Sequence, residues 1–336
     1  MLHASWTPEG VELVEGPQAD LRAGWARLEV TGCGICGSDL HVYRGMQSGV
    51  LRPHDFATPG HEIAGRVVDG PTDMADIIYA VEPSVTCRVC ADCVVGNLPL
   101  CPDGELLGIH QAGGLAQFVD VPPHLLHPVD DRLDGRLASL AEPWAVAVRG
   151  VHRSKLTEID ERVLVLGGGT IGLLSGLAAR DRAARVGVTC RYPHQAELAR
   201  SFGLEPVAPD TVDEWSAEHR PGVVIETVGG MADTMADAIR VARPGGRIVV
   251  VGVFSANLAT DYRALMLKEL EVVGSYLYGT VASGSEFGAA VRSMGPMADE
   301  LAAFQTHHYA LEDLGAAFTT ADDKSSLAVK VTIGAA

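Results

Sequence analysis

The stretch "RVLVLGGGTIGLLSGLAA", residues 162–179, constrains the fold of this chain more than any other feature. The run RVLVL is typical of a buried strand, and IGLLSGLAA after the glycines is typical of a helix. The glycines have the spacing G-x-G-x-x-G, a motif that becomes specific only between a strand and a helix. They permit a tight turn and the close approach of a pyrophosphate, which the amides and dipole of the helix N-terminus attract. We therefore predict a dinucleotide site whose contacts include Gly167, Gly169, Thr170, Ile171 and Gly172.

Strand-like and helix-like segments alternate along the chain from about residue 160. Strands are expected at "GVVIETVG", "GRIVVVGVF" and "LEVVGSYLYG", with helical segments such as "MADTMADAIRVA" between them. This rhythm predicts an α/β fold with a doubly wound parallel sheet. The first 150 residues instead alternate short strand-like runs with turns rich in glycine and proline. A chain of 336 residues is too long for one ordinary core, so we expect two domains.

The net charge, the apolar segments and the cysteine content limit the partners and the compartment that we expect for this chain. The chain has 26 basic and 43 acidic residues, a formal charge of −17, which disfavours nucleic acid and anionic membranes as partners. The first residues, "MLHASWTPEGVELVEG", lack a basic start followed by an apolar run, so no signal peptide is expected. The longest uncharged apolar stretch, residues 163–179, is too short to span a membrane. Seven clustered cysteines favour metal ligands over disulfides, and a cytoplasmic enzyme is expected.

The segment "CRVCADCVVGNLPLC" places four cysteines at the spacing C-x₂-C-x₂-C-x₇-C. Zinc in structural sites binds four soft ligands in a tetrahedron, and a short cysteine-rich loop can supply all of them. A redox cluster and an iron–sulfur site are the alternatives, but the last interval does not match common ferredoxin spacings. We predict a structural zinc held by Cys87, Cys90, Cys93 and Cys101.

The end of the strand after the glycine motif indicates which nicotinamide cofactor binds. An NAD site usually places an acidic residue there, to bond the ribose 2′-hydroxyl. Here the position falls on Cys190, with Arg191 next and no carboxylate before Glu197. A thiol does not repel a 2′-phosphate and an arginine can pair with one, so we predict NADP(H) over NAD(H). The alternative is that Arg191 is only a solvated charge on a loop.

Three further segments offer ligands for a metal. In "TGCGICGSDLHVYRG", the spacing of Cys33 and Cys36 has three interpretations: a disulfide, half of a zinc knot, or one metal ligand beside a bystander. "ATPGHEIAGRVV" presents His61 and Glu62 at the start of a strand. Glu142, in "LASLAEPWAVAV", is a carboxylate in an apolar run, where it is costly unless paired or bound to metal. The competing interpretation of Glu142 is a helix N-terminal acid.

Five ordered motifs, "CGICGSDLH", "GHEIAG", the four-cysteine loop, "AEPWAVAV" and "GGGTIG", resemble those of the zinc-dependent medium-chain alcohol dehydrogenases. The resemblance is greatest to the polyol branch, which includes sorbitol and threonine dehydrogenases, and it spans nearly the whole chain. It implies a mainly β, GroES-like catalytic domain at residues 1–150 and 290–336 and a Rossmann domain at residues 151–289. It also implies a homodimer or homotetramer that pairs the sheet edges of the nucleotide domains.

The resemblance assigns roles residue by residue. It implies two zinc ions per chain, of which the catalytic one is bound by Cys36, His61 and Glu142, with Cys33 a bystander. Around that ion it implies that Asp39 orients the imidazole, that Glu62 lies just behind, that Ser38 takes the substrate proton, and that His41 passes the proton to solvent.

These assignments predict an enzyme that interconverts a small secondary alcohol and its ketone by hydride transfer with NADP(H). The expected substrate is a polyol, a sugar or a cyclitol-like molecule. An alkene reductase on the same scaffold is one alternative, but a carbon acceptor does not need the proton path of Ser38 and His41. A non-catalytic nucleotide-binding relative is another, but such a protein would be expected to lose the ligands at 36, 61 and 142.

Overall fold

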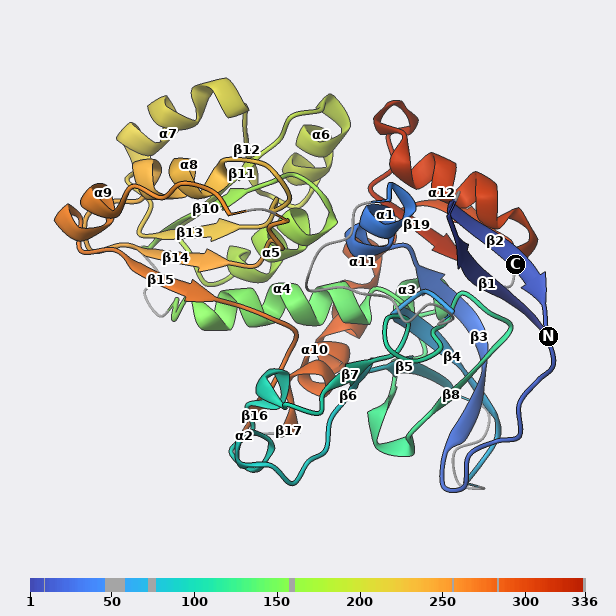
Figure 1. Cartoon of the computed structure of the whole chain (residues 1–336). Coiled ribbons are helices and arrows are strands. Elements are labelled where there is room, and N and C mark those ends of the chain that lie inside the picture. Colours follow the sequence, from blue (N-terminus) through green and yellow to red (C-terminus); the bar gives the residue numbers. More distant parts are fainter. Residues whose placement is uncertain are drawn as a thin grey trace. The chain divides into compact units, whose positions relative to one another are not determined.

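The computed structural model describes residues 1–8, 10–45, 58–71, 77–156, 161–255, 257–282 and 284–334. The chain forms two compact units, one made of Met1–Glu142 with Tyr278–Ala336 and the other of Pro143–Leu277 (Figure 1). The sequence placed these boundaries at 150/151 and 289/290. Helix α4 (Ala141–Arg153) contains both the expected boundary at 150/151 and the observed one at 142/143. Because one helix runs across both positions, the sequence pattern does not change where the first unit ends. At the second, the Tyr278 ring packs edge-on against Phe287, 5.1 Å between centroids, which joins Tyr278 to the first unit.

The Pro143–Leu277 unit contains the predicted parallel sheet. Its strands are hydrogen-bonded in the order β12-β11-β10-β13-β14-β15, and all neighbouring pairs are parallel (Figure 1). This order is that of a doubly wound dinucleotide-binding sheet, with its switch point between β10 and β13. The strand bounds are β10 (Arg162–Leu166), β11 (Arg185–Thr189), β12 (Glu205–Val207), β13 (Val223–Glu226), β14 (Arg247–Val250) and β15 (Glu271–Gly274). The fold class expected from the sequence is confirmed.

The helices of this unit follow the strands in alternation. They are α5 (Thr170–Arg180), α6 (Pro193–Ser201), α7 (Val212–His219), α8 (Thr234–Val241) and α9 (Tyr262–Leu267). The core between sheet and helices includes fully buried Leu164, Val224, Ala238 and Ile248. Parallel strands buried on both faces read as continuous apolar runs, which is why the sequence identified them.

The other unit is built on a mainly antiparallel sheet. Its strand order is β18-β19-β3-β4-β5-β9, and β8 pairs with β3 beside this path. The bounds are β3 (Ala26–Gly34), β4 (Glu62–Asp69), β5 (Ile78–Val81), β8 (Phe118–Val121), β9 (Leu126–Pro128), β18 (Gln305–Tyr309) and β19 (Lys330–Ile333). Short two-stranded sheets accompany it: β1 (Leu2–Thr7) with β2 (Gly10–Glu15), β6 (Ser84–Val85) with β7 (Glu105–Leu106), and β16 (Thr280–Val281) with β17 (Gly284–Ser285).

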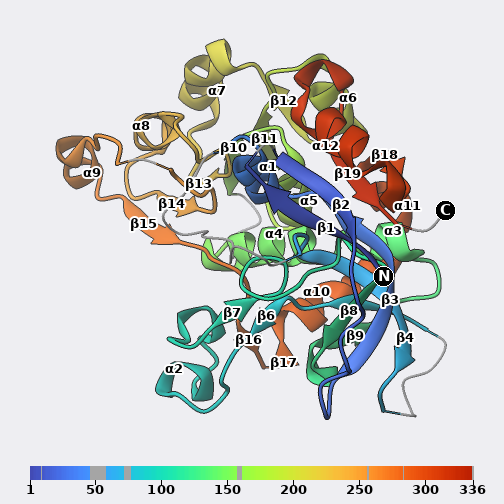
Figure 2. The ribbon, with the colours of Figure 1, turned by 45° about the vertical axis from the view of Figure 1, so that its right-hand side comes forward.

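This unit also contains short helices. They are α1 (Gly37–Tyr43), α2 (Ala91–Val94), α3 (Gly135–Ala138), α10 (Glu286–Met294), α11 (Ala298–Ala302) and α12 (Leu314–Asp322). Strands β1 and β2 lie beside α12 in both views (Figure 1, Figure 2), and Trp6 meets Phe318 edge-on, 5.9 Å between centroids. Helix α12 therefore joins the two ends of the chain in one core, which contains Leu28, Ile63 and Val331. None of the described helices has the length and apolar character needed to cross a membrane.

Candidate active site and metal centres

The four cysteines of the 87–101 loop converge on one point. All four sulfur atoms lie within 4.8 Å of one another, with 3.9 Å between Cys87 and Cys93 and 3.5 Å between Cys101 and Cys87. A tetrahedron with zinc–sulfur bonds of about 2.3 Å has sulfur–sulfur edges of about 3.8 Å, so this spacing fits zinc. The amides of Cys90 and Cys93 donate to the sulfurs of Cys87 and Cys90 at 3.4 and 3.5 Å. Hydrogen bonds from the backbone of Val89 and Cys90 lower the pKa of the Cys87 thiol to about 7.

Local structure explains why this loop closes. Cys90 is the N-cap of helix α2, so its sulfur is turned toward the first amides of that helix. Gly96 has a positive φ of +85°, and an added Cβ there would collide with the Thr280 hydroxyl. The Thr280 amide also donates to the Gly96 carbonyl at 3.1 Å. The glycine turn thus folds the arm back and fastens it to β16.

The two cysteines of the first motif have different surroundings. Cys33 lies inside β3, fully buried, and Cys36 is the half-buried N-cap of helix α1. Both are free thiols, so the disulfide interpretation of this pair is wrong. The Cys36 amide donates to Asp39 Oδ2 at 2.9 Å, which fixes the start of α1.

His61 is buried among the other residues of the predicted centre. Its Nε2 lies 3.3 Å from the Ser38 hydroxyl oxygen, and its Nδ1 lies 3.9 Å from Asp39 Oδ1. Burial by itself lowers the pKa of His61, but the charges of Cys36, Asp39 and Glu142 together raise that pKa well above its ordinary value. Asp39 therefore faces the nitrogen distal to Ser38, the arrangement of a carboxylate that orients a metal-binding imidazole.

Glu142 brings a buried carboxyl to the same group. It lies in the first turn of α4 with 6% of its surface exposed, and burial raises its pKa to about 7 although the charge of His61 lowers it. Among the described residues, only the four-cysteine loop has ligand atoms that all lie within 4.8 Å of one another. Cys36, His61 and Glu142 do not meet that limit. The three side chains are a thiol, an imidazole and a carboxyl, which are donor types that zinc sites use.

Glu62 is held by a residue that the sequence analysis did not identify. Lys330 donates to both carboxylate oxygens of Glu62 at 2.7 Å and to the Ile35 carbonyl at 3.0 Å. A lysine within the apolar run "LAVKVTI" was the available signal, since a buried lysine needs a partner. Both carboxylate oxygens of Glu62 are therefore bonded to Lys330.

His41 lies on helix α1, three residues after Ser38, so the two side chains share one helix face. His41 is half-buried, and burial followed by the nearby Arg44 lowers the pKa of its imidazole. A largely neutral imidazole can both accept and donate a proton near neutral pH.

The glycine motif has the geometry that a dinucleotide requires. Gly167 has φ +116°, and an added Cβ on Gly172 would collide with the Gly167 carbonyl oxygen. An added Cβ on Gly169, the N-cap of α5, would meet no atom within 4 Å. Thr170 and Ile171 form the first turn of α5, where backbone amides face outward for an anion.

Cys190 and Arg191 follow β11 directly, where the sequence placed them. Burial raises the pKa of Cys190 to about 11, so its thiol is neutral at pH 7. Gln195 Oε1 accepts from the amides of Arg191 and Tyr192 at 3.2 and 3.3 Å, which fixes the turn. Arg191 is exposed, and its guanidinium has no hydrogen-bond or ion-pair partner among the described residues. No carboxylate occupies the position that usually selects NAD.

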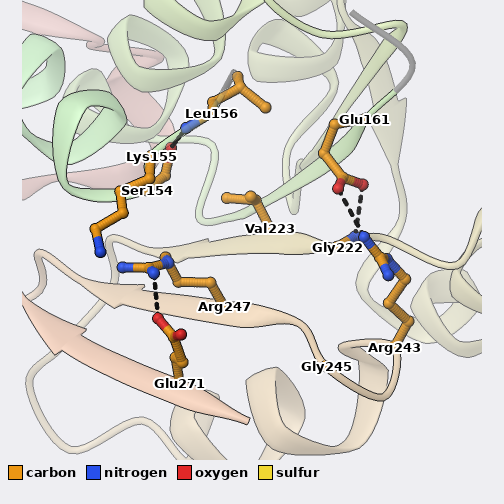
Figure 3. Close-up of a pocket in the computed structure, with 10 residues that line it drawn as sticks. All are labelled: Ser154, Lys155, Leu156, Glu161, Gly222, Val223, Arg243, Gly245, Arg247 and Glu271. Carbon is orange, nitrogen blue, oxygen red and sulfur yellow. Dashed lines mark hydrogen bonds and ion pairs between the residues drawn. The ribbon is translucent and has the colours of Figure 1, made fainter. Parts of the chain in front are cut away.

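A cavity of about 180 Å³ lies at the opposite edge of the parallel sheet, where β10, β13, β14 and β15 begin (Figure 3). Four of its charged groups form two ion pairs, Arg243 with Glu161 at 2.8 Å and Arg247 with Glu271, and Lys155 also lines it. Ligands of doubly wound sheets bind at the carboxyl ends of the strands. This cavity is therefore not part of the predicted dinucleotide site.

Comparison with known protein families gives two matches. Residues 22–131 match the alcohol dehydrogenase GroES-like domain, and residues 170–294 match the zinc-binding dehydrogenase family.

Individual relatives cover nearly the whole chain. A 2-dehydro-3-deoxy-L-galactonate 5-dehydrogenase from Pseudoalteromonas atlantica is 32% identical over 323 residues, 92% of each chain. An L-arabinitol 4-dehydrogenase from Hypocrea jecorina is 28% identical, covering 98% of this chain and 91% of the relative. Among solved structures, L-idonate 5-dehydrogenase from Escherichia coli has a TM-score of 0.87 at 26% identity, covering 99% of this chain and 97% of its own. A zinc-binding dehydrogenase from Sinorhizobium meliloti, bound to NADP, has a TM-score of 0.85 at 26% identity over the full length of both chains.

Proposed function

This chain belongs to the zinc-dependent medium-chain alcohol dehydrogenases, in their polyol branch, and on that premise we propose that it oxidises a sugar-derived secondary alcohol with NADP. The reaction class, interconversion of an alcohol and a ketone, follows from the family. The substrate class is supported by relatives that are named for sugar acids and sugar alcohols. The cofactor preference is supported by Cys190 and Arg191 after β11.

The observation that carries the mechanism is the 3.3 Å contact between the Ser38 hydroxyl and His61 Nε2. Cys36, His61 and Glu142 would hold the catalytic zinc, and the four-cysteine loop a second, structural zinc. When bound, the catalytic zinc polarises the substrate oxygen and the nicotinamide accepts the hydride. Because a ligand on Nε2 would lie beside Ser38, this hydroxyl is placed to take the substrate's hydroxyl proton.

The remaining residues of the site move or hold charge. His41, on the same helix face as Ser38, passes the proton onward to solvent. Asp39 Oδ1 lies 3.9 Å from Nδ1 of His61, and this nearby negative charge would favour a proton on Nδ1 and leave Nε2 for the metal. Cys36 and Glu142, as thiolate and carboxylate, balance the two positive charges of the ion.

We also propose that the enzyme is a cytoplasmic homodimer or homotetramer. Strand β15 is the last of its sheet, and its Val272 is 41% exposed. An exposed edge strand with apolar side chains is a template for pairing with a second copy. Free cysteines in a zinc-like cluster support a reducing compartment.

A substrate panel tests the proposed reaction. Polyols, sugar acids, cyclitols and simple secondary alcohols are oxidised in parallel with NADP and NAD, and a conjugated enone is offered with NADPH. We expect turnover of a sugar-derived secondary alcohol with higher kcat/KM for NADP. Reduction of the enone double bond without alcohol oxidation, or no turnover at all, would overturn the proposal.

A further inference from the structure

Glu226, the last residue of β13, has a fully buried carboxyl whose two oxygens differ in how many hydrogen bonds they accept. Its Oε1 accepts three hydrogen bonds: from the Val228 amide at 2.8 Å, the Gly229 amide at 2.9 Å and the Thr234 hydroxyl at 2.7 Å. Its Oε2 is buried and has no hydrogen-bond partner among the described residues. Burying a carboxyl costs free energy, so a buried carboxyl oxygen that accepts three hydrogen bonds indicates a specific structural role.

The donors belong to the segment that follows β13. Gly229 and Gly230 have φ of +58° and +62°, the left-handed region that favours glycine. Gly230 exchanges backbone hydrogen bonds with the segment after β14, donating to the Val253 carbonyl at 2.8 Å and accepting from Ser255 at 3.1 Å. Glu226 thereby fixes a turn that is joined to the neighbouring loop.

The same segment contacts the glycine motif. Thr227 donates to the Leu166 carbonyl through its amide at 3.0 Å and its hydroxyl at 2.8 Å. An added Cβ on Gly167 would lie 2.6 Å from the Thr227 hydroxyl and 2.9 Å from a methyl group of Val228. The turn after β13 is therefore packed against the predicted pyrophosphate loop at the switch point of the sheet.

Two apolar side chains are exposed on these joined loops. Val228 and Val253 have 46% and 38% of their surfaces exposed, although their backbones are fastened together through Gly230. In a doubly wound sheet the second set of strands, here β13 to β15, receives the second nucleotide of the cofactor. An apolar surface beside the pyrophosphate loop suits the face of a nicotinamide ring better than water.

From these contacts we infer that Glu226 is a positioning residue for the nicotinamide half of the cofactor. It holds the 227–230 turn so that Val228 and Val253 present one apolar surface at the carboxyl ends of β13 and β14. Glu226 acts through the backbone and does not itself touch the ring. The inference rests on the proposed function, because it takes the ligand to be a nicotinamide dinucleotide.

The test separates the two halves of the cofactor. Glu226→Ala, Glu226→Gln and wild-type protein are titrated with NADPH and with 2′,5′-ADP, which carries only the adenosine half. Glu226→Ala is expected to weaken NADPH binding on the order of tenfold, because three hydrogen bonds to the turn are lost. The affinity for 2′,5′-ADP should stay within about twofold, and Glu226→Gln should behave like wild type because its amide oxygen still accepts the three bonds.

Two results for Glu226→Ala would overturn the inference. Equal losses of affinity for NADPH and for 2′,5′-ADP would show a merely structural role, and an unchanged affinity for NADPH would show no role in binding the cofactor. If Glu226→Ala does not fold, Thr234→Val replaces it, because this change removes only one of the three donors. Thr234→Val should weaken the binding of NADPH but not that of 2′,5′-ADP. Equal effects on the two ligands would overturn the inference. If the wild-type protein prefers NADH, the titrations use NADH and 5′-AMP in place of NADPH and 2′,5′-ADP. A wild-type protein that binds no dinucleotide would defeat the proposed function, a separate failure.

Discussion

Lys330 and Glu62 form a buried ion pair between residues that lie 268 positions apart in the sequence. The Lys330 ammonium donates to both oxygens of Glu62 at 2.7 Å, and the side chains are 4% and 1% exposed. Strand β19 places Lys330 there because it pairs antiparallel with β3, Thr332 opposite Gly34. The last strand of the chain therefore supplies the countercharge for the acid next to His61.

Replacement of Lys330 by Met should lower the free energy of unfolding by about 3–5 kcal/mol, because it leaves Glu62 buried without a partner. The double variant Lys330→Met with Glu62→Met should recover most of this loss, since no unpaired charge remains. Urea unfolding at pH 7 measures both. Equal stability of the single variant and wild type would contradict a tight buried pair.

Metal analysis of the purified protein should give two zinc ions per chain. Cys87→Ser and Cys36→Ala should each lower the content by one, because each removes a ligand from a different site. Cys33→Ala is the matched control: Cys33 is a buried thiol of β3, and its loss should leave both ions in place. A single zinc that disappears with Cys87→Ser would refute the catalytic centre.

Glu142→Ala should reduce turnover to background and remove the catalytic zinc, while NADPH affinity changes little. The reason is that Glu142 is the only predicted ligand with a hard oxygen donor, and its carboxylate balances charge on the ion. Turnover, zinc content and NADPH affinity are measured separately, the affinity by fluorescence titration. A variant that stays active with two zinc ions would show that Glu142 is not a ligand.

Arg191→Ala should weaken NADPH binding by about 1–3 kcal/mol, the cost of losing a charge-assisted hydrogen bond to the 2′-phosphate. NADH lacks that phosphate, so its affinity should be unchanged. Arg182→Ala is a suitable control, since Arg182 is also exposed in the same unit but lies after α5, away from β11's carboxyl end. Equal NADPH affinity in Arg191→Ala and wild type would favour the solvated-charge interpretation.

Stability should depend on pH through Glu161, which pairs with Arg243 at 2.8 Å. Partial burial raises the pKa of Glu161, but hydrogen bonds from Arg243 and from the amides of Arg162 and Gly222 outweigh it and lower the pKa below its ordinary 4.5. A carboxyl with a lowered folded-state pKa stabilises above its unfolded value and loses this contribution as pH falls through the folded one.

Glu161→Gln should therefore cost about 1 kcal/mol or less at pH 7, because Arg243 is partly exposed to solvent. The difference from wild type should shrink as the pH falls below 4.5. Urea unfolding at pH 7, 4.5 and 3.5 measures it. A difference that grows toward low pH would contradict this sign.

The sequence alone determined the features whose residues are close together in the chain. The glycine turn between β10 and α5, the four-cysteine loop and the Cys190–Arg191 pair all depend on short spacings and local backbone geometry. The alternation of apolar runs also predicted the parallel sheet, because buried strands and amphipathic helices differ in period.

The tertiary structure alone decided which distant residues meet. The pairing of Lys330 with Glu62 depends on the register of β19 against β3, and the effect of the His61 charge on the pKa of Glu142 depends on the placement of α4 and β4. The partners of Glu226 depend on a turn whose left-handed glycines are held by the segment after β14. Such contacts are set by sheet register and core packing over the whole unit, and short sequence patterns do not contain that information.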